Sequence, residues 1–146
     1  MYEERVYREL VNSNLIQSIV VEEESDLQVL ATVEFNSLAY LRKLRWKIAT
    51  YIQSRPKFQT SYDAIEIDDE ADAMINHMIS AGKQAQVGPM AAVAGTVSEY
   101  LGKEVRRYAD EVIVENGGDI YMDCKGDKEV LIFAGTSILS NRLAIK

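Results

Sequence analysis

Residues 87–122 place two unusual backbone features within one short unit, and this unit constrains the fold more than any other part of the chain. A Gly-Pro step opens a segment rich in alanine and glycine, which predicts a helix from Pro89 to about Leu101. An apolar strand at 111–115 follows, and then a turn at 116–119 that reads Asn-Gly-Gly-Asp. Paired glycines supply the positive φ angles that other residues avoid, and small side chains admit a close approach of backbone or ligand. Because a plain hydrophobic core requires neither feature, we expect a site here.

The first part of the chain has the pattern of strands. Residues 2–10 alternate roughly between apolar and charged side chains, as a half-exposed strand does. Two apolar runs rich in β-branched residues follow at 15–21 and 27–33, with polar breaks between them. Three successive strands, mostly with short connections, indicate an antiparallel meander.

The spacing of the apolar residues then changes to that of helices. From Ser37 they fall on one helical face, Asn36 is a suitable N-cap, and Pro56 ends the helix. A second helix is predicted to start in the acidic turn at 68–72, where carboxylates complement the helix dipole. Gly102 is the expected C-cap of the third helix.

Strands return after the glycine turn, at 120–123, at 130–134 and, as the chain reaches its last residues, at 142–145. We therefore expect a single α+β domain over residues 1–146. Its sheet is predicted to be mixed and mostly antiparallel, with about three helices packed on it. An unpaired strand at 142–145 would leave an open apolar edge that invites pairing with another chain.

The charge of the chain excludes two classes of partner. With 23 acidic and 16 basic residues the formal net charge is −7, which suits neither nucleic acid nor an anionic membrane. The basic run Arg42, Lys43, Arg45 and Lys47 is interpreted as the solvated face of a helix. The single cysteine, Cys124, rules out an internal disulfide, and the N-terminus lacks the pattern of a signal peptide. We expect a cytoplasmic protein.

The start of the third helix is a candidate anion site. Its first amides lack partners within the helix and carry partial positive charge, so they would hold phosphate or carboxylate. The residues assigned to this binding position are Gly88, Pro89, Met90 and Ala91. An alternative remains open, in which the small residues only let the helix pack tightly on a sheet.

The glycine turn is the second candidate. Glu115, Asn116 and Asp119 surround Gly117 and Gly118 with two carboxylates and an amide. A simple two-residue hairpin explains an Asn-Gly pair but does not require acids on both sides. We expect at least one of the glycines to have positive φ. Asp119 is expected to share a cavity with the helix start, either accepting hydrogen bonds from ligand hydroxyls or lying near a cation.

Two motifs carry a resemblance to a known family. The segment VGPMAAVAG at 87–95 and the segment VENGGDIY at 114–121 resemble the ApbE superfamily, the flavin transferases once called thiamine-biosynthesis lipoproteins. The similarity is closer to a shorter branch of that superfamily, and it covers most of the chain. Smaller matching segments are Ser25-Asp26-Leu27, Arg45, Tyr51-Ile52, Pro56-x-Phe58 and Ala134-Gly135.

The resemblance implies an ApbE-like fold that binds FAD or FMN with Mg²⁺ and transfers an FMN group to a protein hydroxyl. The transferases carry a lysine in their helix, whereas this chain has none between Lys83 and Lys103, and Glu115 stands where they have asparagine. Three functions therefore stay open: a flavin-transferring or flavin-dependent enzyme, a non-catalytic protein that binds a phosphorylated metabolite, and a protein-interaction module. Members of the branch continue past the equivalent of Lys146. We thus expect an N-terminal piece of a longer domain that forms a homo-oligomer or binds the missing C-terminal segment.

Overall fold

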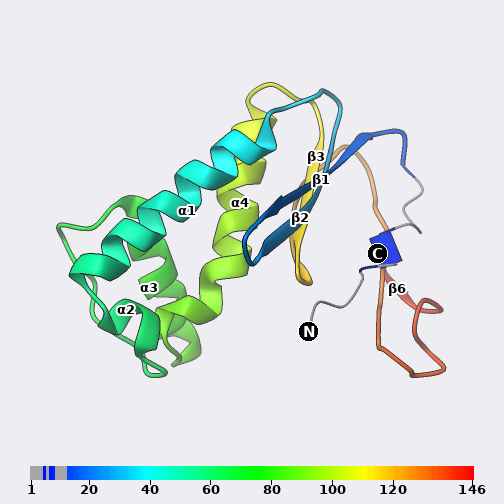
Figure 1. Ribbon diagram of the computed structural model, residues 1–146. Helices are drawn as coiled ribbons and strands as arrows, with labels where there is room; N and C mark the ends of the chain where they lie inside the picture. The colour runs from blue at the N-terminus through cyan, green and yellow to red at the C-terminus, as the bar shows by residue number, and fades with distance from the viewer. Residues whose placement is uncertain (1–4, 6, 9–12) are drawn as a thin grey trace.

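The computed structural model describes Arg5, Tyr7, Arg8 and residues 13–146, and it places helices on one face of a four-stranded antiparallel sheet (Figure 1). The sheet order is β1-β2-β3-β4, and a separate pair of short strands, β5 and β6, follows it. The elements are β1 (Ile16–Glu22), β2 (Ser25–Ala31), α1 (Ser37–Ser54), α2 (Lys57–Thr60), α3 (Ala73–Ala85), the 3₁₀ helix η2 (Pro89–Ala92), α4 (Val93–Arg106), β3 (Val112–Asn116), β4 (Asp119–Asp123), β5 (Val130–Leu131) and β6 (Ala144–Ile145). The expected α+β class is confirmed, with four α-helices in the described part of the chain where about three were predicted.

The described strands agree with the expected N-terminal meander as far as they reach, and the sheet adds a neighbour that the sequence did not predict. β1 and β2 form a hairpin close to the ranges predicted for them, and β2 then pairs with β3 on its other side. This pairing joins strands that are separated by all of the helices along the chain. The strand predicted at 2–10 lies mostly outside the described residues.

One face of the sheet forms the core with the helices. Leu27 and Val29 of β2 point to this face together with Val112 and Val114 of β3, since residues two apart on a strand share a face. α4 packs against β3 and β4, and α1 packs against β1 and α4 (Figure 1). The largest fully buried side chains all belong to this layer and to the helices behind it: Phe58, Leu27, Leu41, Leu44, Met74, Ile75, Met78, Ile79, Leu101, Val105, Val112 and Val114.

The predicted start of α1 is confirmed, whereas α3 begins later than the sequence predicted. The Asn36 side chain accepts a hydrogen bond from the Ala39 N–H at 3.2 Å, which confirms the predicted N-cap of α1. α3 begins later than predicted, at Ala73, and Asp72 is its N-cap. The Asp68 side chain accepts hydrogen bonds from Glu70 N–H and from the Tyr51 hydroxyl. It thereby stabilises a turn ahead of the helix instead of the first helical turn.

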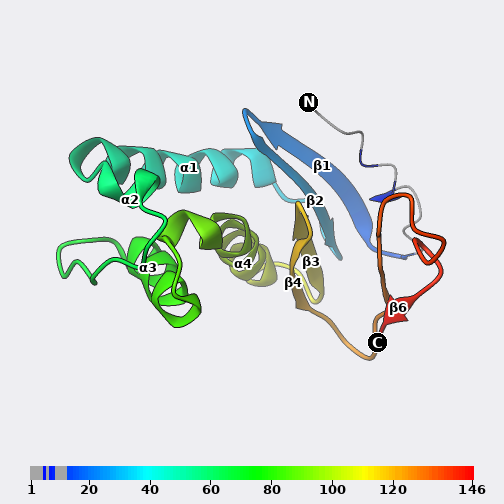
Figure 2. The ribbon, with the colours of Figure 1, turned by 90° about the horizontal axis from the view of Figure 1, so that it is seen from below.

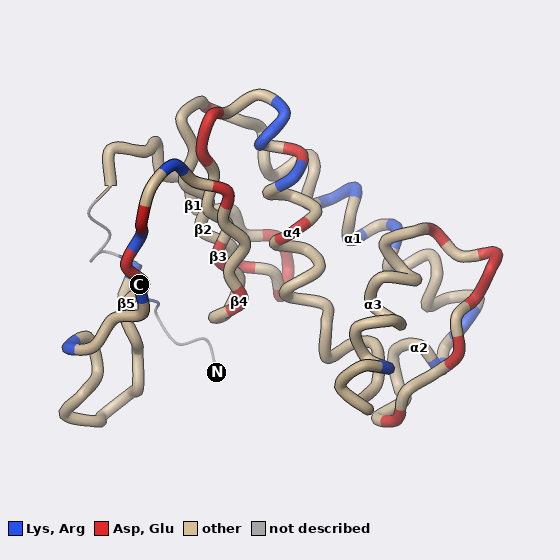
Figure 3. The backbone as a smooth tube through the Cα atoms, turned by 180° about the vertical axis from the view of Figure 1, so that it is seen from behind, with Lys and Arg blue, Asp and Glu red and all other residues tan. Residues whose placement is uncertain are grey.

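Acidic residues pair with the basic run of α1. Arg42 binds Glu22, Arg45 binds Glu24 beside the β1–β2 turn, and Lys47 binds Asp72. Figure 3 shows several acidic residues along the loop between α2 and α3. None of the helices in the described part of the chain combines the length and apolar character needed to cross a bilayer.

The third predicted helix begins with Pro89 as expected but starts as the 3₁₀ turn η2 and continues as α4 through Gly102. The expectation that Gly102 caps the helix was therefore wrong. Gly102 lies inside α4 because the ring of Tyr121 packs on it: a Cβ added there would lie 2.1 Å from Tyr121 Cδ1. A contact between helix and sheet, and not helix termination, explains this glycine.

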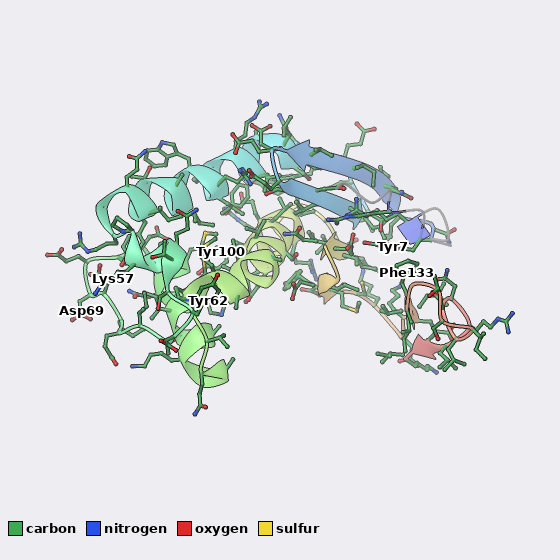
Figure 4. All side chains as sticks on the ribbon, turned by 60° about the horizontal axis from the view of Figure 1, so that its bottom comes forward. Tyr7, Lys57, Tyr62, Asp69, Tyr100 and Phe133 are labelled. Carbon is green, nitrogen blue, oxygen red and sulfur yellow. The ribbon has the colours of Figure 1, made fainter. Side chains whose placement is uncertain are left out.

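The C-terminal strands are shorter than predicted and pair with each other. Val130 pairs with Ile145 and Leu131 with Ala144, so only parts of the expected strands at 130–134 and 142–145 are present. Figures 1 and 2 both place residues 124–146 on the side of the sheet that faces away from the helices. The ring of Phe133 lies 5.5 Å from that of Tyr7, which links this segment to the N-terminal residues (Figure 4).

The contact between Gly102 and Tyr121 predicts that Gly102→Ala changes the unfolding free energy in opposite directions with and without the Tyr121 ring. Gly102→Ala should destabilise the chain by about 1 kcal/mol, because forcing a methyl group into a packed contact costs about 1–3 kcal/mol. The gain in helix propensity returns only about 1 kcal/mol of that cost. In a Tyr121→Ala background the same change should stabilise the chain, since only the propensity gain remains. Urea unfolding of the four variants measures both values. Stabilisation by Gly102→Ala in both backgrounds would contradict the packing argument.

Candidate functional site

The Asn-Gly-Gly-Asp turn is a tight two-residue hairpin connection between β3 and β4. Asn116 pairs with Asp119, and the two residues between them have positive φ, 63° at Gly117 and 100° at Gly118. Such angles match the right-handed twist of a hairpin, and residues with a Cβ rarely adopt them. The predicted positive φ is confirmed at both glycines.

The turn lies against the first half of α4. The Asn116 side chain donates to the Ala94 carbonyl at 3.3 Å, and the Ser98 hydroxyl lies 3.4 Å from the Asp119 carbonyl. A Cβ built on Gly95 would lie 3.4 Å from Asp119 Oδ1, so the carboxylate rests beside the helix at its smallest residue. The Asp119 side chain is exposed, and within the described residues no group forms a hydrogen bond or ion pair with its carboxylate. The structure thus brings Asn116 and Asp119 to α4 as one group.

The expected anion-binding helix start is covered by the loop that follows α2. The Gly88 N–H donates to the Tyr62 carbonyl at 2.8 Å, and the Ala91 N–H donates to the Gly88 carbonyl at 3.1 Å. Gly88 has an ordinary φ of −65°, but a Cβ there would lie 1.8 Å from the Ser61 carbonyl oxygen. The glycine is therefore required by this close contact, and two of the amides assigned to an anion are already bonded within the chain.

Asp119 adjoins Gly95 and not the start at Gly88. Seven residues of helix separate the two positions, which corresponds to roughly 10 Å at 1.5 Å per residue. Pro89 is buried and Met90 is half-buried, while Ala91 is exposed. The structure therefore divides the predicted site into a covered part at Gly88 and an open part at the turn. Anion binding at Gly88 stays a prediction.

Glu115 points away from this group. It pairs with Gln28 and so lies on the opposite face of the sheet from Asn116, as alternation along a strand requires. There its carboxylate binds Arg8, with Nη2 to Oε2 at 2.5 Å, and accepts a hydrogen bond from the Tyr7 hydroxyl at 2.8 Å. Its Oε1 also accepts a hydrogen bond from the Gly118 N–H at 2.9 Å. Glu115 therefore stabilises the turn from the face of the sheet opposite α4.

Arg8 is the centre of a buried ion-pair cluster that the sequence did not predict. Its Nη1 lies 2.5 Å from Asp26 Oδ1, and its side chain is only 6% exposed. Arg5 adds a hydrogen bond from Nη1 to the Asp26 carbonyl at 2.7 Å. Burial lowers the pKa of Arg8, but its hydrogen bonds to Asp26 and Glu115 outweigh that effect and raise it. Burial and the hydrogen bond to Glu115 raise the pKa of Tyr7. No periodic pattern marks these residues, because they meet only after distant strands have paired.

The exposed part of the site, at the glycine turn, offers groups that can form hydrogen bonds with a ligand. Asp119 supplies a carboxylate that forms no hydrogen bond or ion pair within the described residues, and the small residues Ala94 and Gly95 of α4 lie beside the turn. Among the described residues no three histidine, cysteine, aspartate or glutamate side chains are grouped so as to hold a metal ion. The geometry suits the recognition of hydrogen-bond donors on a ligand.

Comparison with known proteins identifies the relatives of this chain. A family model described as AbpE bacteria matches residues 8–146. A UPF0280 protein of Methanococcus maripaludis is 43% identical over 103 residues, which is 70% of this chain and 42% of the relative. Those of Methanocaldococcus jannaschii and Archaeoglobus fulgidus are 38% and 42% identical over matches that cover 42% and 41% of their lengths. The match thus spans less than half the length of these relatives.

These comparisons overturn the expected relationship to the flavin transferases. The matching family model carries a different description, and the relatives are UPF0280 proteins. The two motifs that suggested the resemblance, 87–95 and 114–121, are explained in part by packing. Gly88 contacts Ser61, and the glycine turn closes a hairpin.

The cluster behind the turn predicts a large effect of Glu115→Gln. This substitution keeps the shape of the side chain but leaves Arg8 buried with only Asp26 as its acidic partner, so it should cost about 2–4 kcal/mol of unfolding free energy. The Gly118 amide should also lose protection from hydrogen exchange. Glu104→Gln is the matched control, since Glu104 pairs with an exposed Arg107 and should change stability by about 0.5 kcal/mol at most. Equal effects of the two variants would argue against a structural role for the cluster.

Proposed function

The chain belongs to the AbpE bacteria family, and from that premise we propose that it binds a hydroxyl-bearing small molecule, of the nucleotide class, beside the glycine turn. The binding surface in this proposal consists of Asp119, Asn116 and the small residues of α4 at Ala94 and Gly95. The proposal concerns binding and includes no reaction. The neighbouring α4 residues are alanine, glycine and serine, which supply no general acid or base at neutral pH.

The observation that carries the proposal is the state of the Asp119 carboxylate. It is exposed and has no partner in the described part of the chain, yet it rests against the backbone of a helix. Glu115, only four residues earlier, is buried and bonded to Arg8, Tyr7 and Gly118. One acid of the turn therefore serves the fold, and the other is available to a ligand.

The chemistry of a carboxylate selects the part of the ligand that it binds. An ionised carboxylate only accepts hydrogen bonds, and its two oxygens can receive a pair of neighbouring hydroxyls. Dinucleotide-binding folds use an acidic residue in this way to bind the ribose. A phosphate would be repelled by Asp119, so in this proposal the sugar hydroxyls lie at the turn and the phosphate lies away from it.

The test is a calorimetric titration of the wild-type chain with FMN, ADP and inorganic pyrophosphate, each with and without Mg²⁺. At least one of the two hydroxyl-bearing probes should bind, and Asp119→Asn should weaken that binding about tenfold to a hundredfold. This range corresponds to the loss of about 1.5–3 kcal/mol for hydrogen bonds to a charged group. Pyrophosphate, which has no hydroxyl-bearing carbon, should be insensitive to the substitution.

Asp69→Asn is the matched control, because it removes the same charge from an exposed position in the loop between α2 and α3. It should leave the affinity unchanged. The proposal fails if neither nucleotide binds at millimolar concentration, or if the two substitutions have equal effects.

A further inference from the structure

The face of the sheet that points away from the helices exposes apolar side chains along both of its edges. Ile19 pairs with Gln28, and Ile120 pairs with Glu115, so both lie on the same face as the buried ion-pair cluster. Val21 of β1 and Met122 of β4 share that face with them. These four side chains are 38–53% exposed. We call the four residues the back-face patch.

The C-terminal segment adds further exposed apolar residues on the same side of the sheet (Figure 2). Between 131 and 145 seven large apolar side chains are at least 38% exposed: Leu131, Ile132, Phe133, Ile138, Leu139, Leu143 and Ile145. In the described residues, β5 and β6 pair only with each other. The contact of Phe133 with Tyr7 orients this segment toward the back face without covering the patch.

Isolated apolar residues on a surface are ordinary, but eleven large exposed ones gathered on one side of the sheet mark an interface. The family model matches through Lys146, so these residues belong to the shared domain of the family. The relatives also contain polypeptide outside the match, amounting to more than half of their length. The exposed apolar side chains and the length of the relatives outside a match that covers 70% of this chain are separate observations that both favour an interface.

We propose that the back-face patch is the docking surface for the polypeptide that the UPF0280 relatives carry outside the matched part. That polypeptide packs an apolar face across Ile19, Val21, Ile120 and Met122 and against the segment 130–145. This inference concerns the opposite face of the sheet from Asp119 and does not depend on ligand binding.

The charges of the back face determine the chemistry of the occupant. Arg5 and Arg8 neutralise Asp26 and Glu115, and their hydrogen bonds are made within the cluster. Among the described residues, the two arginines and two carboxylates of this cluster therefore carry no net formal charge. An apolar partner gains from burying the rim of the face, and it leaves the ion pairs intact. β4 also has a sheet neighbour only at β3 in the described residues, so its outer edge is available to a strand of the same partner.

The experiment compares thiol labelling in this chain and in a fusion. The fusion joins this chain to the unmatched part of the Methanococcus maripaludis relative, in the order in which that protein has them. Single cysteines are introduced by Ile19→Cys and Ile120→Cys in a Cys124→Ser background. The background change removes a half-buried thiol and keeps a hydroxyl for the Val112 carbonyl. Both new thiols should react at least tenfold more slowly in the fusion than in this chain.

Ile67→Cys is the control, because Ile67 is 42% exposed in the loop before α3, far from the back face. Its labelling rate should be the same in the two proteins. Equal rates at positions 19 and 120 in the two proteins would overturn the proposal. Protection that is already present in this chain and disappears on dilution would overturn it as well, since the occupant would then be a second copy.

A second measurement covers the case in which the fusion does not fold. The unmatched part of the relative is added to this chain as a separate polypeptide, and complex formation is followed by sedimentation velocity. The proposal expects a one-to-one complex that Ile120→Lys weakens at least tenfold and Ile67→Lys leaves unchanged. If no complex forms, or if the two lysine variants bind equally, the proposal is wrong.

Discussion

The close approach of α4 to the β3–β4 hairpin is the constraint on which the rest of the structure depends. Gly95 admits the Asp119 carboxylate and Gly102 admits the Tyr121 ring, and these glycines lie seven residues apart on one face of the helix. Asp119 and Tyr121 lie two residues apart on one face of the strand. Both contacts therefore lie along one face of α4. They place the glycine turn beside this helix.

The hairpin also directs its two flanking acidic residues to opposite faces of the sheet. Glu115 and Asp119 both flank the glycines, but alternation along β3 sends Glu115 to the back of the sheet and leaves Asp119 with the helix. The buried cluster then restrains the turn through the Gly118 amide. The cluster thus fixes the turn on one face of the sheet, while Asp119 stays exposed on the other.

Local signals predicted the parts of the fold that depend on neighbouring residues. The Asn36 cap, the extent of α1 and the glycine hairpin follow from short-range chemistry, and all three are present. The contacts of Gly88 and Gly102 were missed because their partners, Ser61 and Tyr121, are brought to them only by the tertiary fold. The side to which Glu115 points depends on strand register, and its partner Arg8 lies more than a hundred residues away. For the same reason the sequence placed Asp119 at the Gly88 helix start, whereas it lies beside Gly95 in the first turn of α4.

The ion-pair cluster has a consequence for how these proteins change over evolutionary time. Asp26 and Glu115 both pair with buried Arg8 and also with Arg5, so removing one member unbalances charges in a region that water reaches poorly. Substitutions at positions 8, 26 and 115 are therefore tolerated together more readily than one at a time. A family alignment should show these three columns varying in concert, with the composition of the glycine turn following the identity of residue 115.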